Sequence, residues 1–530
     1  MIMNKDKETK VYLIGGGIAS LAAAVYCIKD AGIKGESISI FDEAKRIGGS
    51  LDAQDLSESE GYVMRGIRMF EEKAFTATFD LMASIPSLIA KGKTLREEFV
   101  EFNKKSRSYS KARLLKNRQV IDSHPLGLSS KDRLNLIGLL LRSEVSLEDR
   151  DIKSLFTNDF FTSNFWYEFC TVFAFQPWHS AIEFRRYFLR FIQGFSTIDT
   201  LEDIEISPYN QYEFLVMPIV DWLKSRGVVF VTNAKVTDVG FVSTRKGQRV
   251  EYIIYGQCGT ETKVMVKESD RVIMTLGSIV ANSAIGSMHT VPIVDLRNKS
   301  GSWALWERIA AGRPEFGVPA VFGGHTDRSG WTSFTITFRD RTFFDLMEKF
   351  VHKKVTTYGG VNIVDSNWFM SVVLSYKPYF LHQPNTINLC WGYGLRSDAV
   401  GNIVKKKMSE CTGEEILIEL VHHLGFEAHR DAILGSAVCI PCGTPYITSL
   451  FLPRKISDRP AVVPQGAMNF AFVGQYCEVP GDVVFTVEYS IRSAQIAVDT
   501  LFGLDKRPSP MYKGIRHMGV LYAAMKTIIR

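Results

Sequence analysis

The stretch that decides the fold is VYLIGGGIASLAAAVYCIKDAG, residues 11–32. Its first four residues form a short apolar run typical of a buried strand, and the small-residue segment after the glycines is typical of a helix. Gly15 and Gly17 allow the backbone to turn tightly and to approach a ligand closely, while Ser20 takes the third small position of the motif. A pyrophosphate can bind at such a helix N-terminus. The stretch therefore predicts the first turn of a doubly wound α/β domain that binds a nucleotide.

A second apolar strand is predicted at residues 37–41 (SISIF), and it ends in two carboxylates placed to accept hydrogen bonds from ribose hydroxyls. Five residues separate the first of them, Asp42, from the pair Gly48 and Gly49. This spacing resembles the FAD-binding glutathione-reductase-like superfamily, which implies FAD as the cofactor and Asp42 as the ribose acid. An NAD site would not require the glycine pair. The residues predicted for this half of the site are Asp42, Glu43, Gly49 and Ser50.

Two later segments are typical of chain that returns to complete such a site. Residues 271–278 (RVIMTLGS) predict a strand and a turn, and residues 470–476 (FAFVGQY) predict a buried strand that runs into a glycine. A helical apolar rhythm then begins at Tyr489. These segments contribute four further predicted cofactor contacts, Gly277, Ser278, Gly474 and Asp482.

The nucleotide domain is therefore predicted to be discontinuous, with substrate elements inserted between its parts. Residues 130–195 favour helices rich in aromatic side chains, and residues 330–395 favour strands. The predicted parts are an FAD-binding domain of residues 1–90, 205–300 and 460–505, a mostly helical insertion of residues 91–204, a strand-rich α+β substrate domain of residues 301–459 and a C-terminal helical segment of residues 506–530.

The composition is that of a globular protein with a large core. The 530 residues are 46% hydrophobic and 23% charged, and the length favours two to four domains. A formal net charge of +6 is small for this length, so we expect no nucleic-acid partner. The start MIMNKDKETK lacks the apolar core of a signal peptide, and no apolar run reaches membrane-spanning length. With its eight cysteines the chain is expected to be cytoplasmic, with reduced thiols.

Two of these cysteines, Cys439 and Cys442, form a CIPC motif. Such a pair can be half of a redox or metal site. The sequence supplies no second pair of ligands, so we interpret both as buried small residues beside a proline turn, and we expect no metal.

The C-terminal stretch, residues 506–530, has the pattern of an amphipathic helix. Apolar residues recur at steps of three and four, with basic residues around them. Two interpretations stay open: a helix that lies on an anionic membrane surface, and a helix docked on its own protein or on a dimer mate. The apolar stripe is Ile515, Met518, Tyr522, Met525 and Ile529, and the charges are Lys513, Arg516, His517, Lys526 and Arg530.

Several long and idiosyncratic strings point to a family. They include GGGIASLAAAVY, SNFWYEFCTVFAFQPWHSAIEFRRY, YNQYEF, GSWALWERIAA, TFFDLMEKF, WGYGL and VVFTVEYSIRSAQIAV. In these strings the chain resembles, nearly end to end, the oleate hydratases, flavoproteins once called myosin-cross-reactive antigens. The resemblance implies a homodimeric, FAD-dependent enzyme that takes free unsaturated fatty acids. It would add water across the cis-9 double bond, with no net redox change, to give 10-hydroxy acids.

Hydration of an unactivated alkene needs an acid that protonates one carbon and a base that deprotonates water at the other. The resemblance implies a tyrosine as the acid, within the string YNQYEF, which offers Tyr209 and Tyr212. A phenol with a pKa near ~10 is a weak acid, so nearby positive charge has to help. Arg65 and Arg68 are candidates for that charge.

The resemblance places the water-activating glutamate in a loop with the approximate pattern R-G-G-R-E-M. Here the loop is Arg65-Gly66-Ile67-Arg68-Met69, so Met69 stands where the family has its glutamate. If the segment is helical, Glu72 shares a face with Met69, and if it is extended, Glu71 does. The base can also be absent, with both glutamates on a solvated helical turn. The predicted loop residues are Arg65 and Gly66 for the cofactor, and Arg68, Met69, Glu71 and Glu72 for catalysis.

Two rival functions remain at this point. One is a flavin-dependent lipid oxidoreductase or double-bond isomerase, which would turn over its flavin with an acceptor. The other is a fatty-acid-binding flavoprotein that has lost its base, for which Met69 is the motivating residue.

Overall fold

The computed structural model describes residues 9–57, 60–106, 114–202, 204–351, 360–506 and 508–529. Its centre is a parallel five-stranded sheet with the strand order β20-β13-β1-β2-β9. Three separated parts of the chain supply these strands, as a doubly wound domain with insertions requires. The strands are β1 (Val11–Ile14), β2 (Ile38–Phe41), β9 (Val229–Val231), β13 (Arg271–Thr275) and β20 (Phe470–Val473).

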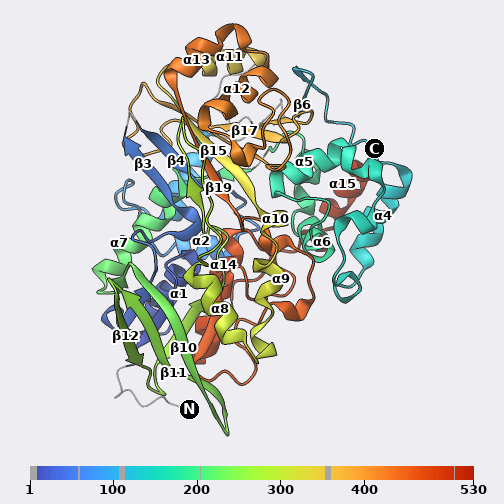
Figure 1. Ribbon diagram of the computed structural model, residues 1–530. Helices are drawn as coiled ribbons and strands as arrows, with labels where there is room; N and C mark the ends of the chain where they lie inside the picture. The colour runs from blue at the N-terminus through green and yellow to red at the C-terminus, as the bar shows by residue number, and fades with distance from the viewer. Residues whose placement is uncertain are drawn as a thin grey trace.

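Helix α1 (Ile18–Lys29) is buried along most of its length. Its Ala22, Ala23 and Ala24 are fully buried, and small side chains allow the helix to lie close to its neighbours. It packs between α14 (Val487–Phe502) and α7 (Met217–Ser225), in the lower half of Figure 1. The α/β fold class predicted from the sequence is confirmed.

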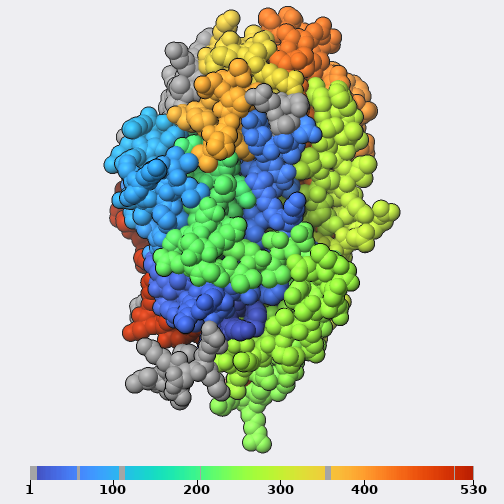
Figure 2. Space-filling view, turned by 90° about the vertical axis from the view of Figure 1, so that its left-hand side faces the viewer, coloured from blue at the N-terminus to red at the C-terminus, as the bar shows by residue number. Residues whose placement is uncertain are grey.

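A three-stranded antiparallel sheet flanks this domain. It consists of β10 (Ala234–Thr244), β11 (Gly247–Gln257) and β12 (Thr260–Met265), and α8 (Gly301–Ala310) packs against β10. The hairpin between β10 and β11 projects from the lower end of the molecule (Figures 1 and 2).

The largest sheet has eight strands with the order β14-β19-β15-β18-β17-β16-β6-β7. Its central strand β15 (Trp331–Phe338) alternates strictly: Phe334, Ile336 and Phe338 belong to a core shared with the helices at the top of Figure 1. Thr335 and Thr337 face the other way. The remaining strands are β6 (Leu114–Lys116), β7 (Gln119–Val120), β14 (Ala284–Ile285), β16 (Gly360–Ile363), β17 (Met370–Leu374), β18 (Asn388–Gly394) and β19 (Ala437–Thr444), and the helices are α11 (Thr342–Phe350), α12 (Gly413–Leu424) and α13 (Arg430–Ser436).

Two details of this sheet differ from the sequence predictions. Strand β6 comes from the range predicted as a helical insertion, yet it pairs in parallel with β16. Cys439 and Cys442 lie within β19, and Pro441 between them pairs with Phe334 of β15, so the predicted proline turn is wrong. Both cysteines are buried, as expected. Within the described ranges, no group of three or more His, Cys, Asp or Glu side chains is arranged to hold a metal ion.

Residues 130–190 of the helical insertion form most of the right-hand lobe of Figure 1. Its aromatic side chains pack on one another, for example Phe169 on Phe184 at a ring-centroid distance of 5.0 Å, which is core packing. The helices are α3 (Leu95–Lys105), α4 (Ser130–Leu141), α5 (Asn164–Phe173) and α6 (Ala181–Arg190), and α2 (Thr76–Met82) precedes them.

The C-terminal helix α15 (Met518–Ile529) packs on this lobe, against the short helical turn Ile192–Thr197. It docks through Ala524 and Ile528, each 1% exposed. The predicted stripe is therefore not the docked face, since Met518 and Tyr522 are 79% and 71% exposed. In the described part of the chain no helix is long and apolar enough to cross a bilayer. Residues 1–8, where the sequence predicts no signal peptide, lie outside the described residues.

Candidate active site

The glycine turn between β1 and α1 is shaped for close approach of a ligand. Gly15 has a φ of +100°, and a Cβ there would lie 3.0 Å from the hydroxyl of Thr275. Gly17 starts α1 without a side-chain cap, and a Cβ at this position would meet nothing within 4 Å. Ser20 is buried, with its hydroxyl 3.2 Å from that of Thr275. The uncapped N–H groups of α1 thus face open space, where a phosphate can bind.

The Gly48–Gly49 pair lies directly against this turn. The amide of Gly48 donates to the carbonyl of Gly16 at 3.1 Å. Gly49 has a φ of +56°, and a Cβ there would lie 3.2 Å from Gly17 Cα. A side chain at either loop would fill the space between them, so these residues fit the pyrophosphate of FAD.

The two acidic residues at the end of β2 have different surroundings. The carboxylate of Asp42 accepts from the amides of Gly16 at 2.5 Å and Ala44 at 2.7 Å, so it stabilises the glycine turn. Burial raises the pKa of Asp42, against the lowering effect of these two bonds. Glu43 is exposed and accepts from the amide of Gly301 at the start of α8, at 2.8 Å. Glu43 is thus the more exposed of the two carboxylates.

The turns after β13 and β20 close the same region. A Cβ at Gly474 would lie 3.3 Å from Thr275 Cγ2, which places Gly474 beside the glycine turn. A Cβ at Gly277 would lie 3.0 Å from Tyr476, and the carbonyl of Ser278 accepts from the indole of Trp303 at 3.2 Å. Gly277 and Ser278 therefore contact an aromatic cluster.

Asp482, predicted as a cofactor contact, is fully buried between two arginines. Its carboxylate lies 3.3 Å from Arg190 Nε and 2.9 Å from Arg492 Nε. Charges paired in this way hold α6, α14 and the preceding loop together.

Substitution of Gly17 by alanine is expected to weaken FAD binding about tenfold or more, which corresponds to about 1.4 kcal/mol. Gly17 has a φ of −80°, so alanine fits the backbone, and its methyl group would project into the open space before α1. The measurement is titration of the purified protein with FAD by flavin fluorescence. Gly138→Ala in α4, where a Cβ also meets nothing, is the control; equal FAD affinity in both variants would contradict this location of the pyrophosphate.

The loop of residues 65–68 lies on the polar face of the eight-stranded sheet. Strand β4 (Gly61–Met64), which leads into it from β3 (Ala53–Ser57), donates from the amide of Met64 to the hydroxyl of Thr335 at 3.0 Å. Arg65 Nη1 then donates to Cys442 Sγ at 3.3 Å, and a Cβ at Gly66 would lie 3.5 Å from Trp391.

Ile67 occupies the position of the second family glycine without backbone strain. It is not one of the described non-glycine residues with a positive φ, and its side chain is partly buried against the core. The conformation of the loop therefore does not require glycine there.

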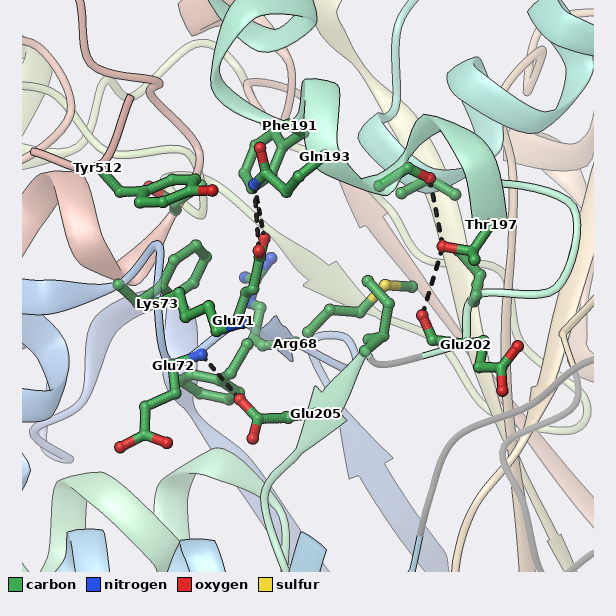
Figure 3. A pocket seen from close by; sticks show the side chains of 18 of the residues that line it. Arg68, Glu71, Glu72, Lys73, Phe191, Gln193, Thr197, Glu202, Glu205 and Tyr512 are labelled. Atoms are coloured by element: carbon green, nitrogen blue, oxygen red, sulfur yellow. Dashed lines mark hydrogen bonds between the residues drawn. The ribbon is translucent and has the colours of Figure 1, made fainter. Parts of the chain in front are cut away.

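The two residues after this loop, Met69 and Phe70, are extended, and a turn follows at residues 72–74. Strand β5 (Met69–Phe70) pairs with β8 (Glu205–Ile206), and Phe70 is 1% exposed. Glu71 accepts from Gln193 Nε2 at 3.1 and 3.0 Å, whereas Glu72 turns away and pairs with Arg96 at 2.7 Å (Figure 3).

A cavity of about 760 Å³ opens beside β5, within the range usual for small-molecule sites. Its apolar lining includes Ile67, Phe173, Phe191, Phe195, Phe485 and Val520. Its polar lining includes Arg68, Lys73, Tyr187, Gln193, Tyr512 and the carboxylates of Glu71, Glu72, Glu202 and Glu205, and Met69 supplies a thioether. The C-terminal segment thus contributes Tyr512 and Val520 to the wall. The lining of this cavity suits a ligand that has a long apolar chain and a few polar groups.

Arg68 is a partly buried cation of the cavity wall. Its guanidinium lies 5.4 Å from the ring centre of Phe485 and donates to the carbonyl of Ser50 at 3.4 Å. Burial lowers the pKa of Arg68, while the phenols of Tyr379 and Tyr187 act in the opposite direction. The sequence patterns did not single out Tyr187, which lies in the aromatic helices interpreted as core.

The two candidate acids stand in different places, and neither lines the cavity. Tyr212 contacts the glycine pair, since a Cβ at Gly48 would lie 3.2 Å from its ring, and the guanidinium of Arg46 lies 3.7 Å from the ring centre. Burial, followed by Glu98, Glu213 and Tyr376, raises the pKa of Tyr209. Of the two tyrosines, only Tyr212 contacts both a cation, Arg46, and the Gly48–Gly49 pair.

Similarity to known proteins agrees with this geometry. Over 506 residues the chain is 39% identical to the oleate hydratase of Streptococcus pyogenes serotype M49 (strain NZ131), covering 93% of this chain and 85% of that protein. It is 30% identical over 566 residues to the linoleate hydratase of Lactiplantibacillus plantarum, covering 96% and 98%. The solved structure of cyclohexylamine oxidase from Brevibacterium oxydans IH-35A shares the fold, with a TM-score of 0.53, 12% identity and coverage of 94% and 99%. Residues 8–498 match the MCRA family, and the chain belongs to it.

Proposed function

We propose that this chain is an FAD-dependent hydro-lyase that adds water to the cis-9 double bond of oleic or linoleic acid and gives the 10-hydroxy acid. The observation that carries this proposal is the 39% identity to an oleate hydratase along 93% of the chain. The apolar cavity beside β5, with acid, amide and guanidinium groups on its wall, supports it. The sum of the reaction is alkene plus water, so no oxidant or reductant is consumed.

The glycine residues around α1 hold the cofactor in this proposal. Gly15, Gly17 and Gly49 leave room for the pyrophosphate, and Glu43 is available to the ribose. Bound FAD would supply shape and charge beside the loop of residues 65–68, without net electron transfer. The chain's own side chains carry out the proton transfers.

Tyr212 is the proposed acid. The double bond then has to lie at the end of the cavity where Arg68 donates to the carbonyl of Ser50, beside the Gly48–Gly49 pair that Tyr212 contacts. There Tyr212 donates its phenolic proton to one alkene carbon, and the guanidinium of Arg46 over its ring stabilises the phenolate that remains. Water attacks the other carbon and loses a proton to a base. The apolar wall of the cavity keeps other water away from the carbocation-like centre.

The direct test is product identification. Purified protein with FAD, a reductant and oleic acid is expected to produce 10-hydroxystearic acid, seen by mass spectrometry, with no stoichiometric uptake of oxygen. An oxidised or isomerised product would favour the oxidoreductase. Fatty-acid binding without any product would favour the binding protein.

We also propose that α15 contacts membranes peripherally, and that the protein is a cytoplasmic homodimer, as its family resemblance implies. The exposed apolar residues Met518 and Tyr522 stand among the exposed basic residues Lys513, Arg516 and Lys526, which supports contact with an anionic surface.

The double substitution Met518→Ser and Tyr522→Ser is expected to weaken binding to vesicles that contain phosphatidylglycerol about tenfold or more, because two exposed apolar side chains are lost. Co-sedimentation measures the effect. Met265→Ser on β12, 59% exposed and on another lobe, is the control. Unchanged binding of the double variant would contradict the membrane contact.

A further inference from the structure

We propose that Glu71 is the base that deprotonates the attacking water, and that Gln193 is the positioning residue that holds its carboxylate. This inference rests on the hydratase function proposed above and names the base for the same cavity. Met69, where the family pattern has its glutamate, carries a thioether that cannot accept the proton.

The extended backbone brings Glu71 to the face of Met69. In the β5–β8 pair, Met69 is opposite Ile206 and Phe70 is opposite Glu205. Phe70 points into the core, with its ring 5.4 Å from that of Phe99. Alternate residues of an extended chain point to opposite sides, and Glu71 directly follows the strand, so it is expected on the side of Met69. Both residues line the cavity.

Gln193 fixes the Glu71 carboxylate from the opposite wall. Its side-chain amide donates to both carboxylate oxygens, at 3.1 and 3.0 Å, and also to the carbonyl of Arg190 at 3.1 Å (Figure 3). An amide is neutral, so it orients a carboxylate without the full stabilising field that a guanidinium gives to the ionised form. A carboxylate held in this way remains a competent proton acceptor.

Glu72 is not held by a neutral amide of any described residue, and it does not share the side of Met69. Its carboxylate pairs with the guanidinium of Arg96 at 2.7 Å, and its side chain is 37% exposed. Its backbone amide donates to Glu205 at 2.7 Å, which fixes the orientation of this turn. The helical alternative, in which Glu72 would share the face of Met69, does not apply, because Met69 and Phe70 are in a strand and the turn begins only after Glu71.

The proton balance of the step is complete. As the new C–O bond forms at C10, one proton of the attacking water passes to the Glu71 carboxylate, and the proton at C9 comes from the acid. The protonated Glu71 and the phenolate then return to their starting forms by net transfer of one proton through water. The sum is one water added to one alkene.

Several charged or titratable groups face Glu71 and shape its pH response. Arg68 and Lys73 come from its own segment, Glu205 from β8 and Tyr512 from the C-terminal segment. Burial first, and then Glu71, raise the pKa of Tyr512, which records their proximity.

The test compares Glu71→Gln with Glu72→Gln, two isosteric changes one residue apart. With FAD and oleic acid, Glu71→Gln is expected to lower kcat about 10²–10⁴-fold, the usual contribution of a general base, with KM nearly unchanged. Glu72→Gln is expected to stay within about threefold of the parent. A loss below tenfold in Glu71→Gln, or an equal loss in both variants, would overturn the assignment. Absence of hydration by the unmodified protein would instead refute the proposed function itself.

Gln193→Glu tests the positioning role through the pH profile. A second carboxylate at this site raises the pKa of its neighbour, because two like charges disfavour ionisation. The base then becomes protonated at higher pH, so the acidic limb of kcat is expected to move upward by about one pH unit. Gln193→Leu, which removes the donor, is expected to lower kcat while leaving KM nearly unchanged. An acidic limb that stays in place in Gln193→Glu would overturn the role of Gln193.

Discussion

Replacement of Tyr212 by phenylalanine is expected to reduce kcat for oleic acid hydration about 10²–10⁴-fold, the range found when a general acid is removed. The ring contacts at Gly48 and Arg46 remain in the variant, because only the hydroxyl is lost. FAD affinity should therefore change little, and the defect should appear in kcat. Steady-state kinetics with product quantified by mass spectrometry, together with an FAD titration, measure both quantities.

Tyr209→Phe is the matched control, from the same short string. Burial and the carboxylates of Glu98 and Glu213 raise the pKa of Tyr209, which weakens it as an acid. We expect its activity within about threefold of the parent. If Tyr209→Phe loses activity and Tyr212→Phe keeps it, the assignment of the acid is wrong.

Glu183→Gln is expected to lower the free energy of unfolding by about 3–5 kcal/mol, the usual cost of breaking a buried ion pair on one side. Glu183 Oε1 lies 2.8 Å from Arg454 Nε and 2.8 Å from Arg459 Nη1, and all three side chains are fully buried. Without the Glu183 carboxylate, the buried guanidinium groups of Arg454 and Arg459 have less negative charge close to them and no solvent to compensate. Urea denaturation at neutral pH measures the difference.

The same group predicts a loss of stability in acid. Burial alone would raise the pKa of Glu183, but Arg459, Arg454 and Arg186 outweigh it and lower this pKa from 4.5 to about 2. A lowered pKa in the folded state stabilises the protein above the unfolded value, and the contribution is lost as pH falls from about 4.5 towards about 2. Glu183→Gln should flatten this part of the stability curve.

An exposed pair provides the control for this prediction. Glu307 lies 2.5 Å from Lys299, and both side chains are more than a third exposed. Glu307→Gln is expected to change the free energy of unfolding by less than about 1 kcal/mol. If Glu183→Gln changes it as little as Glu307→Gln, the buried network does not stabilise the fold as argued.

The nucleotide-binding domain was largely predictable because its signals are local. A buried strand, a glycine turn and a small-residue helix are adjacent in the chain, and β1 and α1 have nearly the predicted bounds. Strands β13 and β20 were also visible as short apolar runs that end near a glycine. Local patterns of this kind survive in any tertiary context.

Features that depend on tertiary contacts were not predictable. Glu71 and Gln193 lie 122 residues apart, and nothing near either residue indicates the other. The choice between Glu71 and Glu72 required the conformation of the backbone, which pairing with β8 determines. Sequence periodicity showed that α15 is amphipathic, but the docked face consists of Ala524 and Ile528, two of its less conspicuous apolar positions.

Other polar residues were visible in the sequence while their surroundings were not. Asp482 stands where a cofactor contact was predicted, yet its carboxylate lies between Arg190 and Arg492, which are distant in the chain or on another element. Likewise the CIPC pair lies in strand β19, where the carbonyl of Pro441 accepts from the amide of Gly286. The ion pair of Asp482 with Arg190 and the strand pairing of the CIPC motif both depend on residues far away in the sequence.

The central claim is that the protein adds water to a carbon–carbon double bond. The most direct measurement is incubation with FAD, a reductant and oleic acid in H₂¹⁸O, followed by mass spectrometry of the extracted lipid. We expect a product heavier than the substrate by one labelled water, with the ¹⁸O in a hydroxyl group at C10. A product whose oxygen carries no label from the water, or recovery of unchanged oleic acid, would contradict this account.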